Sequence, residues 1–452
     1  MNIVIVGDGK VGYALTEQLS REGHDITVID NDRETLNESM EALDIIGVKG
    51  NGATRSIQEE AGVPDADLLI AATSGDELNM ICCLMAKHLG CHNTIARIRN
   101  PEYMQQIDMF KEEFGLNMVI NPEQEAAREI SRIIKFPPAT RVDIFSKGQV
   151  ELVEFKITND SPLVDQRIMD LLHRKNAKIL ICAVERNGQA YIPNGAFILR
   201  RGDSIYLTGD SNDIVRFINS VSKNTYKIRS VMIVGGGRMC YYLTRMLDHK
   251  RYEIKIIEKD QHRCEELCEW LPGVTIIHGD GSEQELLKAE GMMGADAFIA
   301  LTGMDEENLI MSMLAKKSGV PKVVTKVNRF NYLDFVDEMG INSVISPKMS
   351  TAVQITQYVR AMQNSYGSKV DTLHKLVDGK AEALEFTVGK TTRHLGVRLQ
   401  EIPFRKNILL GVIVRNRRVI IPGGQDVILQ GDNVVVITNE GSYSDLNDIF
   451  ED

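Results

Sequence analysis

An internal repeat constrains this chain more than any other feature of its sequence. Gly7-Asp8-Gly9 recurs as Gly235-Gly236-Gly237 at an offset of 228, and Gly50-Asn51-Gly52 recurs as Gly279-Asp280-Gly281 at an offset of 229. Self-similarity at a fixed spacing indicates that one folding unit has been duplicated. The 452 residues are therefore expected to form two copies of one module.

The first part of each half alternates short apolar strands with helical segments. In the first copy the expected strands are Ile3–Val6, Ile26–Ile29, Ile45–Val48, Leu68–Ala72, Thr94–Ile98 and Met118–Ile120. This alternation is typical of an α/β domain with a parallel, doubly wound sheet. Near-continuous Val, Ile and Leu suit strands that are buried on both faces.

A smaller α+β part follows in each half. The helix expected over Glu125–Lys135, with its counterpart at Ser350–Met362, ends the first part because prolines follow it. Ser161-Pro162 is expected to begin a helix, and Asn187-Gly188 to form a hairpin turn. The predicted domains are 1–136, 140–225, 228–364 and 370–452.

Composition excludes several classes of protein. A formal net charge of −11 argues against a nucleic-acid binder and against adsorption to an anionic membrane. The seven cysteines form no disulfide or metal-ligand pattern, which favours a reducing cytoplasm and predicts no metal site. The N-terminus reads as a strand rather than a secretion signal, and no apolar run is long enough to span a bilayer. We therefore expect any membrane role to depend on a partner.

The first glycine-rich turn has the pattern of a dinucleotide site. It follows the first strand and opens a helix, and it consists of Gly7, Asp8, Gly9, Lys10, Val11 and Gly12. Its three glycines serve the tight turn, the approach of backbone to a pyrophosphate, and close packing of helix on strand. Helix N–H groups attract the phosphates. Asp30 ends the second strand, where a carboxylate accepts hydrogen bonds from a ribose diol and repels a 2′-phosphate.

Two further strand ends supply candidates. Thr73 and Ser74 follow the fourth strand, where they either face the cofactor or begin the next helix; the two readings are compatible. Arg97 lies in the fifth strand, and a buried cation there needs either a pyrophosphate or a structural ion pair. These residues together predict two tandem copies of a Rossmann-like, doubly wound parallel-sheet domain, each followed by a small α+β domain.

The second turn departs from the first. Its candidate residues are Gly235, Gly236, Gly237, Arg238 and Met239, with Glu258 as the acid. Cys240 replaces the third glycine, and Lys326 stands where the first copy has Arg97. Because lysine lacks the bidentate fork of arginine, the two sites are expected to differ in affinity. The occupancy of the second site and the identity of its nucleotide stay open.

These motifs resemble those of the regulators of Trk/Ktr potassium-uptake systems, over essentially the whole chain. The resemblance rests on Val6–Gly12, Ile29-Asp30, Gly50-Asn51-Gly52, Ala72–Asn79 and Ala96–Arg99. The module of this family, the RCK domain, pairs a Rossmann-type domain with a small C-terminal domain. Two modules in one chain look like the Trk type rather than the single-module Ktr type. The resemblance implies NAD or NADH at Gly7–Val11, Asp30, Thr73, Ser74 and Arg97, with Asn51 as a further candidate.

The resemblance also implies an assembly. It implies a second nucleotide at Gly235–Met239 and Glu258, with ATP or ADP as possible ligands. It further implies a homotetrameric ring of eight modules, peripheral on the inner face of the cell membrane and bound to a potassium-translocating subunit. The alternatives are an NAD-dependent oxidoreductase and a nucleotide binder without a transporter partner. No histidine recurs with an acid in both small domains, so no catalytic residue is predicted. No spacing specifies a ligand for the small domains.

Overall fold

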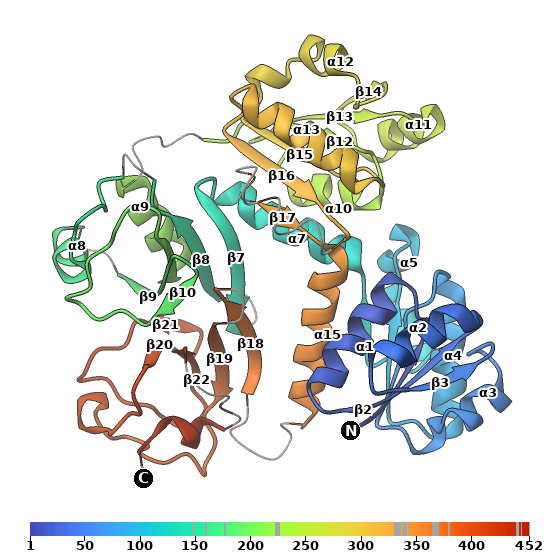
Figure 1. Cartoon of the computed structure of the whole chain (residues 1–452), viewed down its shortest axis with the longest axis horizontal. Coiled ribbons are helices and arrows are strands. Elements are labelled where there is room, and N and C mark those ends of the chain that lie inside the picture. Colours follow the sequence, from blue (N-terminus) through green and yellow to red (C-terminus); the bar gives the residue numbers. More distant parts are fainter. Residues whose placement is uncertain are drawn as a thin grey trace. The chain divides into compact units, whose positions relative to one another are not determined.

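In the computed structural model, the described residues form four sheets, which belong to two compact units (Figure 1). Residues Met1–Ser131 and Arg229–Thr356 form the first unit, and residues Arg132–Ile228 and Gln357–Asp452 form the second. The structure describes all residues except 147–148, 159–160, 176–177, 222–226, 330–335, 337–340, 342, 364–369, 378–379, 440–442, 444 and 452.

The N-terminal sheet is parallel, with the order β3-β2-β1-β4-β5-β6. Its strands are β1 Asn2–Val6, β2 Asp25–Asp30, β3 Ile46–Lys49, β4 Leu68–Ala71, β5 Asn93–Arg97 and β6 Met118–Ile120. Its helices are α1 Lys10–Arg21, α2 Arg33–Ala42, α3 Arg55–Glu60, α4 Asp76–Leu89, α5 Pro101–Gln105, α6 Ile107–Glu113 and α7 Pro122–Lys135, with a 3-10 turn at Val63–Asp65. The strand order reverses between β1 and β4, which is where ligands bind in such sheets.

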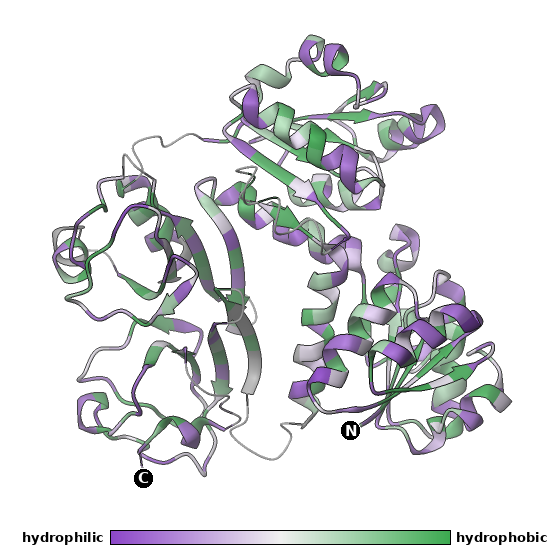
Figure 2. Cartoon of the chain, viewed as in Figure 1, coloured by the Kyte–Doolittle hydropathy of each residue, from purple (hydrophilic) through white to green (hydrophobic). Residues whose placement is uncertain are grey.

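The third sheet in chain order repeats this topology as β14-β13-β12-β15-β16-β17. Its strands are β12 Ser230–Val234, β13 Glu253–Glu258, β14 Thr275–His278, β15 Ala297–Ala300, β16 Lys322–Lys326 and β17 Val344–Ile345. Its helices are α10 Arg238–Met246, α11 Gln261–Trp270, α12 Gln284–Ala289, α13 Asp305–Lys317 and α15 Pro347–Gln363, with a 3-10 turn at Met292–Gly294. Figure 2 shows hydrophobic strands in both parallel sheets, as the sequence predicted.

Each small domain has one antiparallel sheet, of order β10-β9-β11-β8-β7 or β18-β19-β22-β20-β21. The first contains β7 Ala139–Phe145, β8 Val150–Lys156, α8 Ile168–Lys175, β9 Ile179–Arg186, β10 Gln189–Tyr191, β11 Ser204–Gly209 and α9 Ser211–Val221. The second contains β18 Val370–Leu376, β19 Ala381–Thr387, β20 Ile408–Arg415, β21 Arg418–Ile420 and β22 Asn433–Thr438, with 3-10 turns at Leu399–Glu401 and Leu446–Ile449. One buried cluster, which includes Leu152, Cys182, Val412 and Ile437, joins the two sheets.

The predicted fold class is confirmed, and so is the hairpin turn. Asn187 and Gly188 have φ angles of 54° and 71° between β9 and β10, as a two-residue hairpin turn requires. The helix start predicted at Ser161-Pro162 is wrong, because α8 begins at Ile168. The Ser161 hydroxyl instead accepts a hydrogen bond from the Leu163 N–H at 3.3 Å, within a turn that Asp165 continues at a φ of 60°.

The predicted domain boundaries stay predictions. Residues 225 and 364, which end two of the predicted domains, lie outside the described residues. Among the described helices, none has both the length and the apolar character that crossing a membrane requires.

Candidate functional site

A cavity of about 420 Å³ lies at the carboxyl edge of the N-terminal sheet, at the strand-order reversal. Most of the residues predicted for the first site line it, namely Gly7, Gly9, Lys10, Val11, Asp30, Asn51, Thr73, Ser74 and Arg97. The predicted residues Asp8 and Gly12 are not part of the lining. Sequence reasoning missed Val6, Ile29, Asn31, Gly50, Gly52, Ala72 and Leu78, which also line it.

The three glycines of the first turn have different structural roles. Gly7 has a φ of +97°, and a Cβ there would lie 2.9 Å from the backbone of Thr73. A Cβ on Gly12 would lie 1.8 Å from the carbonyl oxygen of Gly7, so this glycine permits the contact of helix and turn. A Cβ on Gly9 would meet nothing within 4 Å. Because no side chain caps α1 at Gly9, the helix end faces open space that suits a phosphate.

The Asp30 carboxylate is held in place by backbone N–H groups. Its Oδ2 accepts from the Asp8 N–H at 2.6 Å, and its Oδ1 accepts from the Asp32 N–H at 2.9 Å. Each carboxylate oxygen has a second lone pair, so a ribose diol can still bind to it. The contact of Asp30 with a ribose stays a prediction.

Asn79 ties two strand ends together beside the cavity. Its Oδ1 accepts from the N–H of Thr73 at 2.8 Å and from the Thr73 hydroxyl at 2.7 Å. Its Nδ2 donates to the carbonyl oxygen of Arg97 at 2.8 Å. Asn308 makes the corresponding contacts to Thr302 and Lys326. The repeat of this asparagine in both halves was the sequence signal for this supporting role.

Arg97 is a largely buried cation with hydrogen-bonding capacity to spare. Its Nη1 donates to the Thr73 carbonyl oxygen at 3.3 Å, while its buried Nε has no partner among the described residues. Burial lowers the pKa of Arg97, and the charges of Arg99 and Arg238 lower it further, whereas Glu123 and Asp76 raise it. An anion in the cavity would supply both a missing acceptor and a compensating charge.

The glycines after β3 pack under the cavity. A Cβ on Gly52 would lie 2.2 Å from the Val6 side chain, and one on Gly50 would lie 2.4 Å from the Ile57 side chain. The Asn51 Oδ1 accepts from the Ala53 N–H at 3.0 Å, which holds the loop in shape. The recurring Gly50-Asn51-Gly52 motif therefore has a packing role in addition to its place in the lining.

The second copy preserves the frame of the site. Gly235 has a φ of +99° and Gly237 precedes α10 without a side-chain cap, as Gly7 and Gly9 do in the first copy. The Glu258 Oε2 accepts from the N–H of Gly236 at 2.6 Å. Met239, predicted to bind nucleotide, is buried.

Hydrogen bonds of Lys326 and Arg263 help to distinguish the second copy from the first. The Lys326 Nζ donates to the Thr302 carbonyl oxygen at 3.0 Å, in place of the Arg97 contact to Thr73. The Arg263 Nε donates to the carbonyl oxygen of Gly236 at 2.8 Å and so holds the second glycine turn to α11. The expectation that the two sites differ in affinity stays a prediction.

The two parallel-sheet domains are in contact beside the first cavity. The Tyr242 hydroxyl on α10 donates to the Arg99 carbonyl oxygen at 2.9 Å and accepts from the Asn121 Nδ2 at 3.0 Å. Burial raises the pKa of Tyr242 to about 12, so the hydroxyl keeps its proton. This pair of hydrogen bonds connects the helix that follows the second glycine turn to the strand end that follows Arg97.

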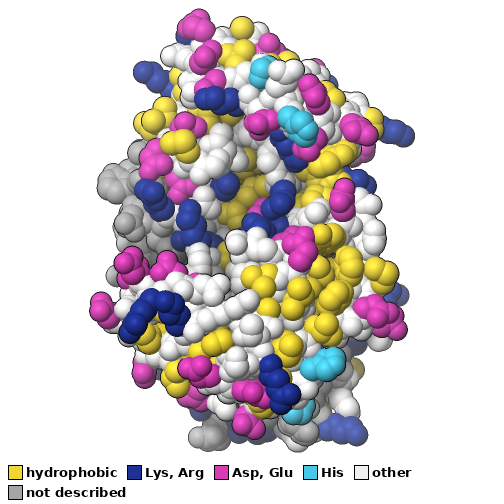
Figure 3. Space-filling model, turned by 90° about the vertical axis from the view of Figure 1, so that its right-hand side faces the viewer, with side chains coloured by type: hydrophobic (Ala, Val, Ile, Leu, Met, Phe, Trp, Pro, Cys, Tyr) yellow, Lys and Arg dark blue, Asp and Glu magenta, His cyan; other side chains and the backbone are white. Residues whose placement is uncertain are grey.

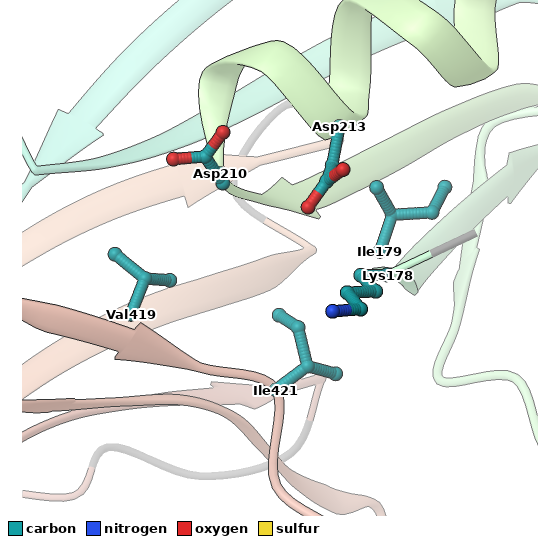
Figure 4. A pocket seen from close by; sticks show the side chains of 6 residues that line it. All are labelled: Lys178, Ile179, Asp210, Asp213, Val419 and Ile421. Atoms are coloured by element: carbon teal, nitrogen blue, oxygen red, sulfur yellow. The ribbon is translucent and has the colours of Figure 1, made fainter.

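A second cavity, of about 340 Å³, lies in the other unit and is shown in Figure 4. Lys178, Asp210 and Asp213 supply its charges, and Ile179, Val419 and Ile421 its apolar wall. At the repeat-related position of Asp210, the Asn439 Nδ2 donates to the Ala190 carbonyl oxygen at 2.9 Å. Since a carboxylate cannot donate this bond, the two sides of the unit differ here.

Two family models each match the chain twice. The TrkA-N domain matches residues 3–122 and 231–347, and the TrkA-C domain matches residues 152–222 and 383–451. "Trk system potassium uptake protein TrkA" of Halomonas elongata and of Vibrio alginolyticus are each 33% identical to the chain, over 100% of it and 99% of their own length. "Trk system potassium uptake protein TrkA homolog 1" of Methanosarcina mazei is 31% identical over the full length of both.

Solved structures share the fold at lower identity. "GsuK channel bound to NAD" has a TM-score of 0.64 at 17% identity, and covers 97% of this chain and 77% of its own. "Crystal structure of the GsuK bound to ADP" has a TM-score of 0.51 at 16% identity, and covers 79% of this chain and 69% of its own. Both domain types match in both halves of the chain, and the relatives match it over its full length. The chain therefore belongs to the TrkA family of Trk-system potassium uptake proteins.

Proposed function

We propose that the chain is a cytoplasmic, nucleotide-responsive regulatory subunit of a Trk-type potassium uptake system. The observation that carries the proposal is the cavity at the first glycine turn, where α1 begins without a side-chain cap and the Nε of the largely buried Arg97 has no hydrogen-bond partner within the described part of the chain. The full-length relatives are named for potassium uptake, which supports the transport role. In this role the chain would act at the inner face of the membrane through a potassium-translocating partner.

NAD or NADH is the proposed ligand of the first site. The glycine turn and Lys10 would hold the pyrophosphate, Asp30 the adenosine ribose, and Arg97 a phosphate oxygen. The negative charge of Asp30 disfavours the 2′-phosphate of NADP. GsuK structures are described as bound to NAD and to ADP, which supports a crevice of this fold that accepts dinucleotides and adenine mononucleotides alike. At the second site, ADP or ATP is the alternative to NAD.

Regulation requires the nucleotide to favour one conformation over another. A ligand shifts an equilibrium only through unequal affinity for the two states. The Tyr242 bridge to Arg99 and Asn121 would make the arrangement of the two parallel-sheet domains sensitive to the first site. A coupling of about 1–3 kcal/mol would change transport from several-fold to about a hundredfold. The partner's state would then alter nucleotide affinity by the same factor.

We propose further that four chains form a ring of eight modules. Both copies expose an isoleucine at the same repeat position, Ile81 on α4 and Ile310 on α13, with 46% and 67% of their surfaces accessible. Figure 3 shows hydrophobic side chains gathered on the part of the surface that the first parallel-sheet domain forms. Repeated apolar positions favour repeated contacts between identical chains. Light scattering of the purified chain measures the mass of the assembly and so tests for a tetramer. Ile81→Lys should reduce that mass, because a charge would replace an apolar contact.

A binding role fits the lining better than hydride transfer does. The ionisable residues that line the cavity are Lys10, Asp30 and Arg97, and the proposal assigns each of them to a phosphate or a ribose rather than to proton transfer. In the small domains, the side chains of His173 and His374 lie outside the described residues. The ring of His394 packs edge-on against Phe450, with centroids 5.0 Å apart. Turnover of NADH with a 2-keto acid would support the oxidoreductase alternative.

Calorimetric titration of the full chain with NAD+, NADH, ADP and ATP tests nucleotide binding. Asp30→Ala should remove the first binding event, and Glu258→Ala should remove the second, because each loses its ribose acceptor. Potassium uptake is then measured in cells that lack the chain and carry either variant. Normal uptake without the chain, or full nucleotide binding by the Asp30→Ala variant, would contradict the proposal.

A further inference from the structure

Asp8 places a buried carboxylate behind the first glycine turn. The residue is 2% exposed. Its Oδ2 accepts a hydrogen bond from the Ser39 hydroxyl on α2 at 2.6 Å, and its buried Oδ1 has no partner among the described residues. A buried charge with half of its acceptors unused is costly, and accepting a proton at the free oxygen removes that cost. The proposed roles of the first site do not use this group.

The charge that acts on the pKa of Asp8 is the negative charge of Asp30. Asp30 lies at the end of β2, and its carboxylate accepts from the backbone N–H of Asp8. Burial raises the pKa of Asp8 to about 6; the Ser39 hydrogen bond lowers it, and the charge of Asp30 raises it. The other charged residues at the adjoining helix starts are Lys10 on α1 and Asp32 and Arg33 at α2. A pyrophosphate at the turn would bring further negative charge close to Asp8.

The second copy has no equivalent group. At the position of Asp8 it has Gly236, and at the position of Ser39 it has the buried Leu267. A Cβ on Gly236 would lie 2.5 Å from the Leu267 side chain, so the leucine fills the space that the polar pair occupies in the first copy. The acid and its hydroxyl partner are therefore present together in one copy and absent together from the other.

We infer that the first site binds its nucleotide together with a proton, which the Asp8 carboxylate takes up, and that the second site binds without one. This inference rests on the proposed nucleotide binding. The phosphates raise the pKa of Asp8 above its value in the free protein, so each binding event draws a proton from the solvent onto Oδ1. The first site then weakens as the pH rises, while the second does not.

The test is calorimetry of the full chain with NAD+, whose pyrophosphate carries no group that titrates near neutral pH. Titrations at about pH 6 and about pH 8 bracket the expected transition. Affinity at the first site should fall by up to about tenfold for each unit by which NAD+ raises the pKa of Asp8. The apparent enthalpy should also vary with the ionisation enthalpy of the buffer, because a proton is taken up.

Two variants identify the group. Asp8→Asn keeps the shape and an acceptor for Ser39 but carries no charge, so it should bind more tightly than the natural chain near pH 8 and show no buffer dependence. Ser39→Ala removes the hydrogen bond that lowers the pKa of Asp8, so it should move the pH dependence to higher pH. Asp30→Ala is the matched control, since it reports on the second site alone, where affinity should not change with pH.

The outcomes separate this inference from the proposed function. NAD+ binding at the first site with neither pH dependence nor proton uptake overturns the inference and leaves nucleotide regulation standing. Unchanged pH dependence in Asp8→Asn also overturns it, because the proton would then reside elsewhere. No binding at any pH overturns both.

Discussion

The hydroxyl of Tyr242 donates a hydrogen bond to the carbonyl oxygen of Arg99 at 2.9 Å, across 143 residues of sequence. Tyr242 lies one turn into the helix that follows the second glycine turn, and Arg99 lies two residues beyond the buried cation of the first site. The contact is therefore a physical link between the two copies at the point where the first copy is expected to hold phosphate.

Replacing this tyrosine tests the link directly. Tyr242→Phe keeps the ring and removes both hydrogen bonds, which should destabilise the first unit by about 1–3 kcal/mol because the Asn121 amide and the Arg99 carbonyl lose a partner. Denaturant unfolding measures this loss. The variant should also reduce the effect of nucleotide at one site on affinity at the other. Coupling equal to that of the natural chain in sequential calorimetric titrations would contradict this role.

The second and third glycines of the pattern, Gly9 and Gly12, should respond differently to a methyl group. Gly12→Ala would place a Cβ 1.8 Å from the Gly7 carbonyl oxygen, so it should lower the melting temperature, at a cost of about 1–3 kcal/mol. The Cβ of a Gly9→Ala variant would meet no atom within 4 Å, so the variant should fold normally. The added methyl group should still obstruct the proposed phosphate site and weaken NAD+ binding. Thermal melting and calorimetry on both variants distinguish the cases; equal melting temperatures would refute the packing role of Gly12.

The two cations should set part of the difference between the sites. Arg97→Lys loses the planar fork and should weaken nucleotide binding at the first site by about 1.5–3 kcal/mol, the range for a hydrogen bond to a charged group. Lys326→Arg is the reciprocal change and should strengthen binding at the second site. Calorimetry measures both changes in affinity. If the Arg97→Lys variant binds nucleotide with unaltered affinity, the role of Arg97 is structural instead.

Asp8 should make stability depend on pH even without ligand. Its pKa is raised from 3.8 to about 6 on folding, so its contribution to stability is fully present below 3.8 and is lost as the pH rises through about 6. Near pH 8 the Asp8→Asn variant should therefore be more stable than the natural chain, by at most about 3 kcal/mol. The difference should disappear at low pH. Melting curves across this range check the sign; equal melting temperatures near pH 8 would show that the buried charge costs nothing.

Features that depend on residues close together in the chain were predictable from the sequence. The glycine turn, its helix and the acid at the end of β2 lie within the first thirty residues, and the offset of 228 to 229 repeats them in the second half. A buried strand, a tight turn and a helix start each have local chemical requirements, so the parallel-sheet fold and most of the first cavity could be read in advance. Ser161-Pro162 shows the limit of such signals, because a serine that accepts a local hydrogen bond suits a turn as well as a helix start.

Contacts between residues from distant strands and from different copies were decided by the tertiary structure alone. Asn79 joins Thr73 to Arg97 because the sheet order places β4 beside β5, and Tyr242 reaches Arg99 because the two copies pack together. Asp8 belonged to the predicted phosphate turn by its position in the sequence, yet packing directs its side chain to Ser39, away from the cavity. The sequence determined which groups are available for chemistry, whereas the direction, burial and partners of each group follow from the packing that surrounds it.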